Sequence, residues 1–380
     1  MKVIFGTDAI KYPLTGIGRY AFELAKCLSD APEISELLFL NGHRLTQQMP
    51  VAKENSSSTE GLKSLIKKSR LASEVYRLTA PWLKTNVLRD HKDAIYHGPN
   101  FYLPPRVERC VVTFHDLSVF TFPQCHPPER VRYMRKELLQ TVKRASVFIT
   151  DSDFTRLELI NYFNISESRV FTAKLACSGE FRPRREEEIT PVLGKYKLAF
   201  KQYSLFTGSI EPRKNIATLL DAYECLPLSL RKQTPLVISG FKGWNSDTLH
   251  RRFEQGEREG WLRYLGFTPS SDLPALYAGA VSFLYPSLYE GFGLPVLEAM
   301  ASGTPVVCSD SSSLPEVAGT CALMSDAMDA EKLTTHILTS IQDNAWRENA
   351  IQLGLEHVKN FSWSRCADET ITAYKQIELN

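Results

Sequence analysis

The chain has 380 residues, of which 43% are hydrophobic and 23% are charged, and its net charge is +2. This length favours two domains over a single core. No apolar run approaches about 18 residues, and the apolar start is interrupted at Asp8, which argues against a spanning helix and a signal peptide. The eight cysteines are scattered without a CxxC pair, so we expect reduced thiols in a cytoplasmic protein.

The first half of the chain is more basic than the second. Residues 1–183 carry 26 Lys and Arg against 19 Asp and Glu, and the remainder carries 19 against 24. An excess of positive charge indicates an acidic surface or acceptor nearby, although chance surface charge explains it equally well.

Apolar runs alternate with helical patterns through residues 1–173. Strands are predicted at 3–5, 37–40, 94–97, 111–114, 146–150 and 169–173, and helices at 21–29, 130–145 and from 151 onward. This alternation predicts a parallel sheet covered on both faces. Thr155 and Glu158 have the spacing of a capping box. His115 follows a strand at the edge where such sheets bind ligands, although a lone histidine is more often structural.

Gly16, Gly18 and Ala21 match the G-x-G-x-x-A fingerprint of dinucleotide sites. The glycines do not directly follow a strand, and Asn41 stands where a ribose-binding acid belongs, so a nicotinamide or flavin site is not favoured. A flexible glycine loop before a helix, close to an interdomain cleft, explains these residues as well.

Residues 61–92 form a basic segment interleaved with apolar side chains and one tryptophan, Trp82. Such a segment can lie on an anionic membrane surface. A solvated helix face packed against its own domain is the equally good alternative.

The αβ pattern restarts after the charged stretch 182–190, which contains Pro183 and is predicted to be a linker. Strands are predicted at 203–207, 236–239, 262–267, 280–285 and 305–308, and helices at 216–226, 272–278 and 363–379. The last of these helices has apolar residues on one face.

Residues 286–307 contain two glutamates, Glu290 and Glu298, separated by a glycine-flanked turn. Pro295 suits the first turn of a helix, so a helix is predicted from Leu294 to Ala301. Free N–H groups at its start suit a phosphate, whereas carboxylates accept hydrogen bonds from sugar hydroxyls. The pattern indicates a nucleotide-sugar site.

Arg213 and Lys214 follow another strand, which ends in Gly208. A guanidinium fork beside an ammonium suits a diphosphate, although a lone basic pair is commonly surface charge. A P-loop motif and a cluster with metal-ligand spacing are absent from the sequence, and Asp151-Ser152-Asp153 is interpreted as helix capping. We therefore expect phosphate binding without a metal.

Three stretches, GSIEPRKN at 208–215, EGFGLPVLEAMASGTPVV at 290–307 and FHDL at 114–117, resemble the retaining glycosyltransferases of family 4. The resemblance covers nearly the whole chain and implies the α/β GT-B fold, in which two Rossmann-like domains have parallel sheets facing an interdomain cleft. It implies an acceptor-side domain at 1–183, a nucleotide-sugar domain at 184–361, and a helix at 362–380 that crosses back. HGPNFYLP at 97–104 and HDLS at 115–118 further resemble bacterial mannosyltransferases of polysaccharide and O-antigen assembly.

The resemblance also implies roles for individual residues. Arg213 and Lys214, beside Gly208, would bind the donor diphosphate and stabilise its leaving charge. Glu290 would hold hydroxyls of the transferred sugar and Glu298 the ribose, with Phe292, Gly293 and Leu294 adjacent. The remaining expected donor contacts are Gly16 and Gly18 to phosphate, His115 to the sugar, and Tyr264 and Leu265 to the base, although strand-end aromatics are commonly core. His115, Glu290, Arg213 and Lys214 are the expected catalytic residues.

A nucleoside diphosphate leaves readily, so the two glutamates need not act as the acid and base of a glycosidase. The expected reaction transfers mannose from GDP-mannose to a lipid-linked saccharide, without a cofactor or nucleic acid, at the cytoplasmic membrane face. Alternatives are a family 4 enzyme with a UDP-sugar donor, a GT-B epimerase or phosphorylase, and a non-catalytic nucleotide-sugar-binding protein.

Overall fold

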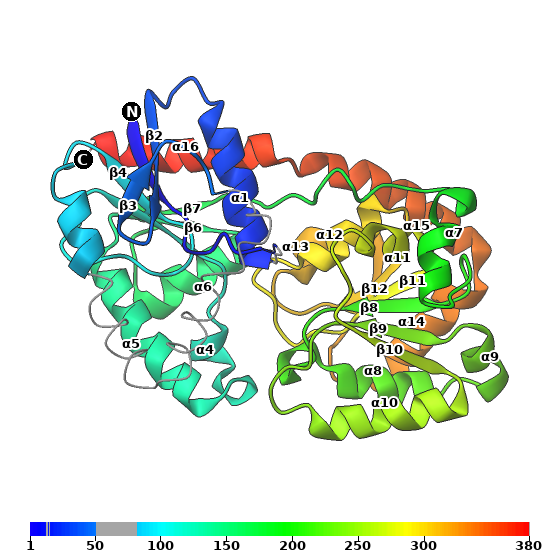
Figure 1. Cartoon of the computed structure of the whole chain (residues 1–380). Coiled ribbons are helices and arrows are strands. Elements are labelled where there is room, and N and C mark those ends of the chain that lie inside the picture. Colours follow the sequence, from blue (N-terminus) through cyan, green and yellow to red (C-terminus); the bar gives the residue numbers. More distant parts are fainter. Residues whose placement is uncertain (13, 15, 51–81, 380) are drawn as a thin grey trace, which may run out of the picture.

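The computed structural model describes residues 1–12, 14, 16–50 and 82–379. Its strands form two separate sheets, and Figure 1 shows these as two units, each flanked by helices. The strands are short and largely buried: every residue of β5 (Cys110–Phe114), β8 (Ser204–Thr207) and β12 (Val306–Ser309) is buried. Complete burial is typical of parallel strands covered by helices on both faces.

In the described part of the chain, the first sheet has seven strands in the order β3-β2-β1-β4-β5-β6-β7. The other strands are β1 (Lys2–Gly6), β2 (Glu36–Asn41), β3 (Arg44–Thr46), β4 (Ile95–Gly98), β6 (Val147–Thr150) and β7 (Val170–Thr172). All neighbours are parallel except β3, which pairs antiparallel with β2, so the expectation of a purely parallel sheet is wrong at this edge. Gly42, with φ of +61°, makes the tight turn after Asn41 that allows this hairpin.

Helices of the first unit are α1 (Gly16–Ser29), α4 (Ser118–Thr121), the 3₁₀ turn η1 (Pro123–Cys125), α5 (Pro128–Arg144) and α6 (Asp153–Phe163). Two predictions need correction. The helix α1 begins at Gly16, so the two glycines lie in its first turn and not in a preceding loop. Ser152 is the N-cap of α6 and accepts from the Thr155 N–H, so Thr155 and Glu158 lie inside this helix and form no capping box.

The second sheet has the order β10-β9-β8-β11-β12-β13 and is parallel throughout its described strands. Its other strands are β9 (Leu236–Ser239), β10 (Leu262–Gly266), β11 (Ser282–Tyr285) and β13 (Ala322–Ser325). The helices are α7 (Glu186–Lys195), α8 (Ile216–Glu224), α9 (Leu228–Gln233), α10 (Asp247–Glu259), α11 (Leu273–Gly279), α12 (Leu294–Ala301), α13 (Leu314–Ala318), α14 (Ala330–Gln342) and α15 (Asn344–His357). Because α7 begins at Glu186, the predicted linker at 182–190 is shorter than expected.

The last helix, α16 (Trp363–Leu379), leaves the second unit and packs on the first, where it contacts α1, β6 and β7 (Figure 1). The Tyr374 hydroxyl hydrogen-bonds the ring of His97 at 2.7 Å. Both ends of the chain therefore lie in the first unit, while the exact domain boundaries at 183 and 361 stay a prediction. Within the described residues, no helix combines the length and apolarity that crossing a membrane requires.

Candidate active site

The centre of the site lies just after β8, where a 3₁₀ turn, η3 (Pro212–Lys214), presents Arg213 and Lys214. Asn215 ends this turn in the left-handed region, with φ of 55°. Its side-chain amide donates to the carbonyls of Pro286, at 3.0 Å, and Ala327, at 2.6 Å. Asn215 thereby fixes the basic pair against the segment that leads to Glu290.

Glu290 lies between the two cations. Its Oε2 is 2.9 Å from Arg213 Nη1, and its Oε1 is 2.6 Å from Lys214 Nζ. Lys214 also donates to the Tyr285 hydroxyl at 2.5 Å, and Arg213 forms a second ion pair with Glu211 at 2.9 Å. The structure therefore brings together three of the four predicted catalytic residues, and two carboxylates balance the two cations.

Burial and the neighbouring charges together set the pKa values in this cluster. Burial opposes ionisation of Glu290, but Arg213 and Lys214 outweigh it and lower the pKa of the carboxyl to about 2. Burial also lowers the pKa of Lys214, and Glu290 only partly offsets this effect. Arg213 has a raised pKa, because Glu290 and Glu211 outweigh its burial. Glu290 is consequently a carboxylate at any physiological pH.

Serines from the loop before α13 hold the segment around Glu290. Ser312 Oγ accepts from the Glu290 N–H at 2.8 Å, and Ser313 Oγ donates to the carbonyls of Glu290 and Phe292 at 2.9 and 2.8 Å. Gly293, with φ of +105°, then starts α12. Among the described residues no side chain caps this helix; Pro295 has no N–H and the Val296 N–H donates to the Gly293 carbonyl at 2.9 Å, so the Leu294 N–H is the donor at this helix start that can meet an anion.

Glu298 lies in α12, apart from the Glu290 cluster, and its surroundings are different. Burial raises the pKa of Glu298 to about 7, while a hydrogen bond from Tyr277 and the positive charge of Arg19 act in the opposite direction. Arg19 belongs to the first turn of α1, so this end of α1 faces α12 from the other domain. The pKa of Glu290 is thus lowered and that of Glu298 is raised, which agrees with separate roles for the two glutamates.

His115 follows β5 and uses both ring nitrogens within the first domain. Its Nδ1 lies 2.7 Å from the Asp151 carboxylate, and its Nε2 lies 2.9 Å from the Pro99 carbonyl. The Pro99 carbonyl can only accept, so Nε2 carries an N–H, and Nδ1 pairs with the carboxyl of Asp151, whose own pKa is raised by burial. Burial opposes the charge, but Asp151 and Pro99 outweigh it and raise the pKa of His115. The interpretation of residues 151–153 as capping alone is therefore wrong for Asp151.

Residues on both sides of Glu290 contact the first domain. The Tyr289 hydroxyl accepts from the Leu117 N–H at 2.9 Å and donates to Glu158. The Gly291 carbonyl accepts from Ser152 Oγ at 2.6 Å. A Cβ at Gly291 would lie only 1.6 Å from the His115 carbonyl oxygen, so only glycine fits there. The position of Glu290 is thereby coupled to the contact between the domains.

Known proteins resemble this chain over its whole length. Residues 195–356 match the family described as Glycosyl transferases group 1. The chain is 51% identical over 379 residues to the O-antigen chain mannosyltransferase B of Escherichia coli, which covers 99% of this chain and 100% of that protein. The chain belongs to the group 1 glycosyltransferases. It is also 33% identical over 257 residues to the serotype-specific mannosyltransferase WbdA of Escherichia coli. This match covers 66% of the present chain and 31% of WbdA.

Solved structures of other glycosyltransferases share the fold. WaaG, a glycosyltransferase involved in lipopolysaccharide biosynthesis, superposes with a TM-score of 0.70 at 16% identity, over 97% of this chain and 98% of that one. Anabaena HepE in complex with UDP and glucose gives a TM-score of 0.71 at 17% identity, over 98% of both chains. The predicted GT-B fold with two Rossmann-like domains is confirmed.

The remaining predicted donor residues of this glycosyltransferase come from both domains. Gly208, with φ of 148°, packs against the Lys214 stem. A Cβ at Gly18 would lie 2.8 Å from the Ala9 carbonyl oxygen, so this glycine serves close packing, whereas Gly16 is exposed. Tyr264 donates to the Gly240 carbonyl at 3.0 Å, and Leu265 beside it is half-buried in β10. Their contacts with a donor stay predictions.

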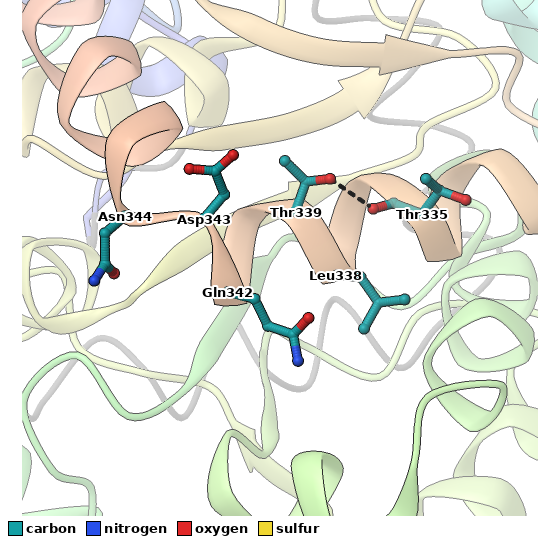
Figure 2. Close-up of a pocket in the computed structure, with 6 residues that line it drawn as sticks. All are labelled: Thr335, Leu338, Thr339, Gln342, Asp343 and Asn344. Carbon is teal, nitrogen blue, oxygen red and sulfur yellow. Dashed lines mark hydrogen bonds between the residues drawn. The ribbon is translucent and has the colours of Figure 1, made fainter.

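Three residues of the glycosyltransferase site escaped the sequence analysis: Glu211, Asp151 and Tyr289. Glu211 and Tyr289 adjoin predicted site residues, and Asp151 directly follows β6, at the strand end where ligands bind. That position was the available signal for Asp151. A hollow of about 580 Å³ lies at the end of α14, remote from this cluster in sequence (Figure 2). Its Asp343 caps α15 by accepting from the Trp346 N–H, so we assign it no ligand.

Proposed function

We propose that this glycosyltransferase transfers mannose from GDP-mannose, with retention of configuration, to a lipid-linked saccharide in O-antigen or polysaccharide synthesis. The observation that carries the proposal is the buried Arg213–Glu290–Lys214 cluster at the carboxyl ends of β8 and β11. The choice of mannose rests on 51% identity over the whole chain to an O-antigen chain mannosyltransferase.

Arg213 and Lys214 bind the donor diphosphate in this proposal. In the part of the chain that the structure describes, Arg213 Nε is buried and has no hydrogen-bond partner. An unpaired buried donor is costly unless a ligand satisfies it. Once a diphosphate displaces Glu290 and Glu211 from their ion pairs, Arg213 and Lys214 can offset its charge, which is the task that a divalent metal performs elsewhere. The proposed reaction is therefore metal-independent.

Glu290 holds hydroxyls of the transferred sugar, and Glu298 holds the ribose. As the sugar–phosphate bond breaks, negative charge grows on the diphosphate, where Arg213 and Lys214 stabilise it more strongly than in the ground state. The leaving group needs no general acid. His115 is held by Asp151 through its ring, and its backbone carbonyl lies against Gly291 at the contact between the domains.

The acceptor and the membrane belong to the first domain in this proposal. The basic segment 61–92 would meet an anionic surface on the cytoplasmic side, although residues 61–81 lie outside the described residues. At the described end of this segment, Trp82 and Leu83 are 51% and 47% exposed. Exposed aromatic and aliphatic side chains beside basic residues favour peripheral membrane contact.

A panel of nucleotide sugars tests the proposal. Purified protein is incubated with GDP-mannose, UDP-glucose or UDP-N-acetylglucosamine, with and without membrane lipid extract, while nucleoside diphosphate release and product are measured. We expect release and transfer with GDP-mannose. Turnover with UDP-sugars alone would overturn the donor assignment. Release of a free epimerised sugar nucleotide would indicate an epimerase. Tight binding of a nucleotide sugar without any turnover would indicate a non-catalytic protein.

A further inference from the structure

A second hollow, of about 740 Å³, lies where the two domains meet, and its size is typical of a small-ligand pocket. The first domain contributes its wall from η1 and α5, and the second domain contributes Asn245. The lining residues are Pro123, Gln124, His126, Pro128, Val131, Arg132, Arg135 and Asn245. The lining combines apolar side chains with amide and guanidinium groups, which can donate to hydroxyl oxygens, so it suits a ligand with both hydroxyls and apolar faces, such as a sugar.

Contacts of Trp244 fix the two walls against each other. Its indole N–H donates to the Cys125 carbonyl of the first domain at 2.6 Å. The Arg130 guanidinium stacks 4.9 Å from the centre of the same indole ring. Asn245 follows in the left-handed region, with φ of 53°. The hollow is thus complete only while the domains are in contact.

His126 brings a buried polar atom without a partner to this hollow. The side chain is 6% exposed, and among the described residues its Nδ1 is buried without a hydrogen bond. Its Nε2 lies 2.9 Å from Ser118 Oγ, which donates to Asp116 at 2.7 Å. Ser118 must therefore accept from an N–H at Nε2. Burial, with help from Arg130, lowers the pKa of His126, so the ring is neutral and Nδ1 is a bare acceptor.

The same segment connects the hollow to the donor cluster. Leu117, between Asp116 and Ser118, donates to the Tyr289 hydroxyl, and the Tyr289 carbonyl accepts from Arg213 at 2.6 Å. The hollow and the predicted diphosphate site are thus linked through Leu117 and Tyr289. An unprotonated ring nitrogen accepts a hydrogen bond from a hydroxyl. It does not bind an ionised phosphate oxygen, because the nitrogen and that oxygen are both acceptors.

We propose that this hollow binds the saccharide end of the acceptor, with His126 Nδ1 accepting from one of its hydroxyls. The inference deepens the proposed function and rests on it only for the identity of the reaction. Since Trp244 and Asn245 come from the donor-binding domain, acceptor binding in this hollow requires the two domains to be in contact.

His126→Gln tests the contact because the glutamine amide can still donate to Ser118 while nothing replaces Nδ1. Gln124→Trp fills the hollow from an exposed position, and Gln342→Trp, in the remote hollow of Figure 2, is its matched control. Binding of methyl α-mannoside and methyl N-acetyl-α-glucosaminide is measured by saturation-transfer NMR in the presence of GDP. We expect wild type and Gln342→Trp to bind at least one probe, His126→Gln to bind it about fivefold more weakly, and Gln124→Trp not to bind.

Turnover gives an independent readout. GDP release from GDP-mannose without acceptor should change less than about twofold in either hollow variant, whereas transfer to membrane acceptor should fall. The inference is overturned if wild type binds neither saccharide, or if both hollow variants bind it as tightly as wild type does. It is also overturned if the hollow binds inorganic pyrophosphate in place of the sugars. Failure of GDP-mannose as donor, with saccharide binding intact, would instead count against the proposed function alone.

Discussion

At the scale of single residues, the site is held by a carboxylate between two cations. Glu290 pairs with Arg213 and Lys214, and Glu211 pairs with Arg213 as well, so the cluster carries no excess charge. A donor diphosphate must therefore compete with these carboxylates for the cations. The arrangement keeps the long basic side chains ordered before the donor arrives, which lowers the entropic cost of binding.

Glu290→Gln should separate turnover from nucleotide binding. The amide keeps the shape but loses the charge-assisted hydrogen bonds to the sugar and its hold on the cations. We expect kcat to fall about 100-fold, while the Kd for GDP changes less than about threefold, because a competitor of the diphosphate is removed. Steady-state kinetics and calorimetry measure the two quantities, and equal losses in both would contradict the assigned role.

Glu298→Gln should change how stability depends on pH. Because the folded pKa, about 7, lies above the ordinary value of 4.5, the stability linked to the protonated carboxyl is lost as pH rises through about 7. Glutamine stays neutral at every pH, so the stability of the variant does not depend on pH through this position. The free energy of unfolding of the variant, relative to wild type, should thus rise by about 1–2 kcal/mol between pH 5 and pH 8. Urea titrations at both pH values measure this difference. The same change in the free energy of unfolding with pH in wild type and variant would refute the prediction.

At the scale of elements, the segment 289–291 joins the two domains. Tyr289 and Gly291 bond to α6 and to the segment after β5, and both flank Glu290. The sugar-binding carboxylate is therefore placed correctly only when the domains are in contact. In this arrangement, water is excluded from the reacting centre at the same step that completes it.

Gly291→Ala should prevent this contact, because the new Cβ would lie 1.6 Å from the His115 carbonyl oxygen. We expect kcat/KM to fall at least about 100-fold, with a larger radius of gyration in small-angle scattering with GDP bound. Gly194→Ala is the matched control, since a Cβ there meets nothing within 4 Å and should leave activity unchanged. Wild-type activity in Gly291→Ala would show that the two domains need not approach this closely.

Local signals predicted the elements better than the contacts between them. The helices α12 and α16 have the predicted bounds, because Pro295 and Gly303 delimit the first and one apolar face marks the second. The hairpin of β2 and β3, which was not predicted, contains Asn41-Gly42, a pair typical of two-residue hairpin turns. The Tyr289–Glu158 bond joins residues 131 positions apart, and no spacing rule encodes such a pair.

At the scale of the whole molecule, α16 completes the first domain from the far end of the chain. Tyr374 bonds His97 Nδ1 at 2.7 Å, His97 Nε2 bonds Thr113 at 2.8 Å, and Thr113 bonds Tyr20 of α1 at 2.8 Å. This buried chain of hydrogen bonds connects α16, β4, β5 and α1. Fully satisfied buried networks of this kind specify one packing arrangement.

Tyr374→Phe should therefore lower stability without affecting the site. Burial lowers the pKa of His97 to about 3, so its ring is neutral and depends on hydrogen bonds to satisfy both nitrogens. Loss of the hydroxyl leaves Nδ1 without its partner, at a cost of about 1–2 kcal/mol, whereas the same change at the exposed Tyr162 of α6 should cost less than about 0.5 kcal/mol. Urea denaturation compares the two variants, and GDP release at 25 °C should match wild type in both. Equal stability of Tyr374→Phe and Tyr162→Phe would mean that α16 is held by apolar packing alone.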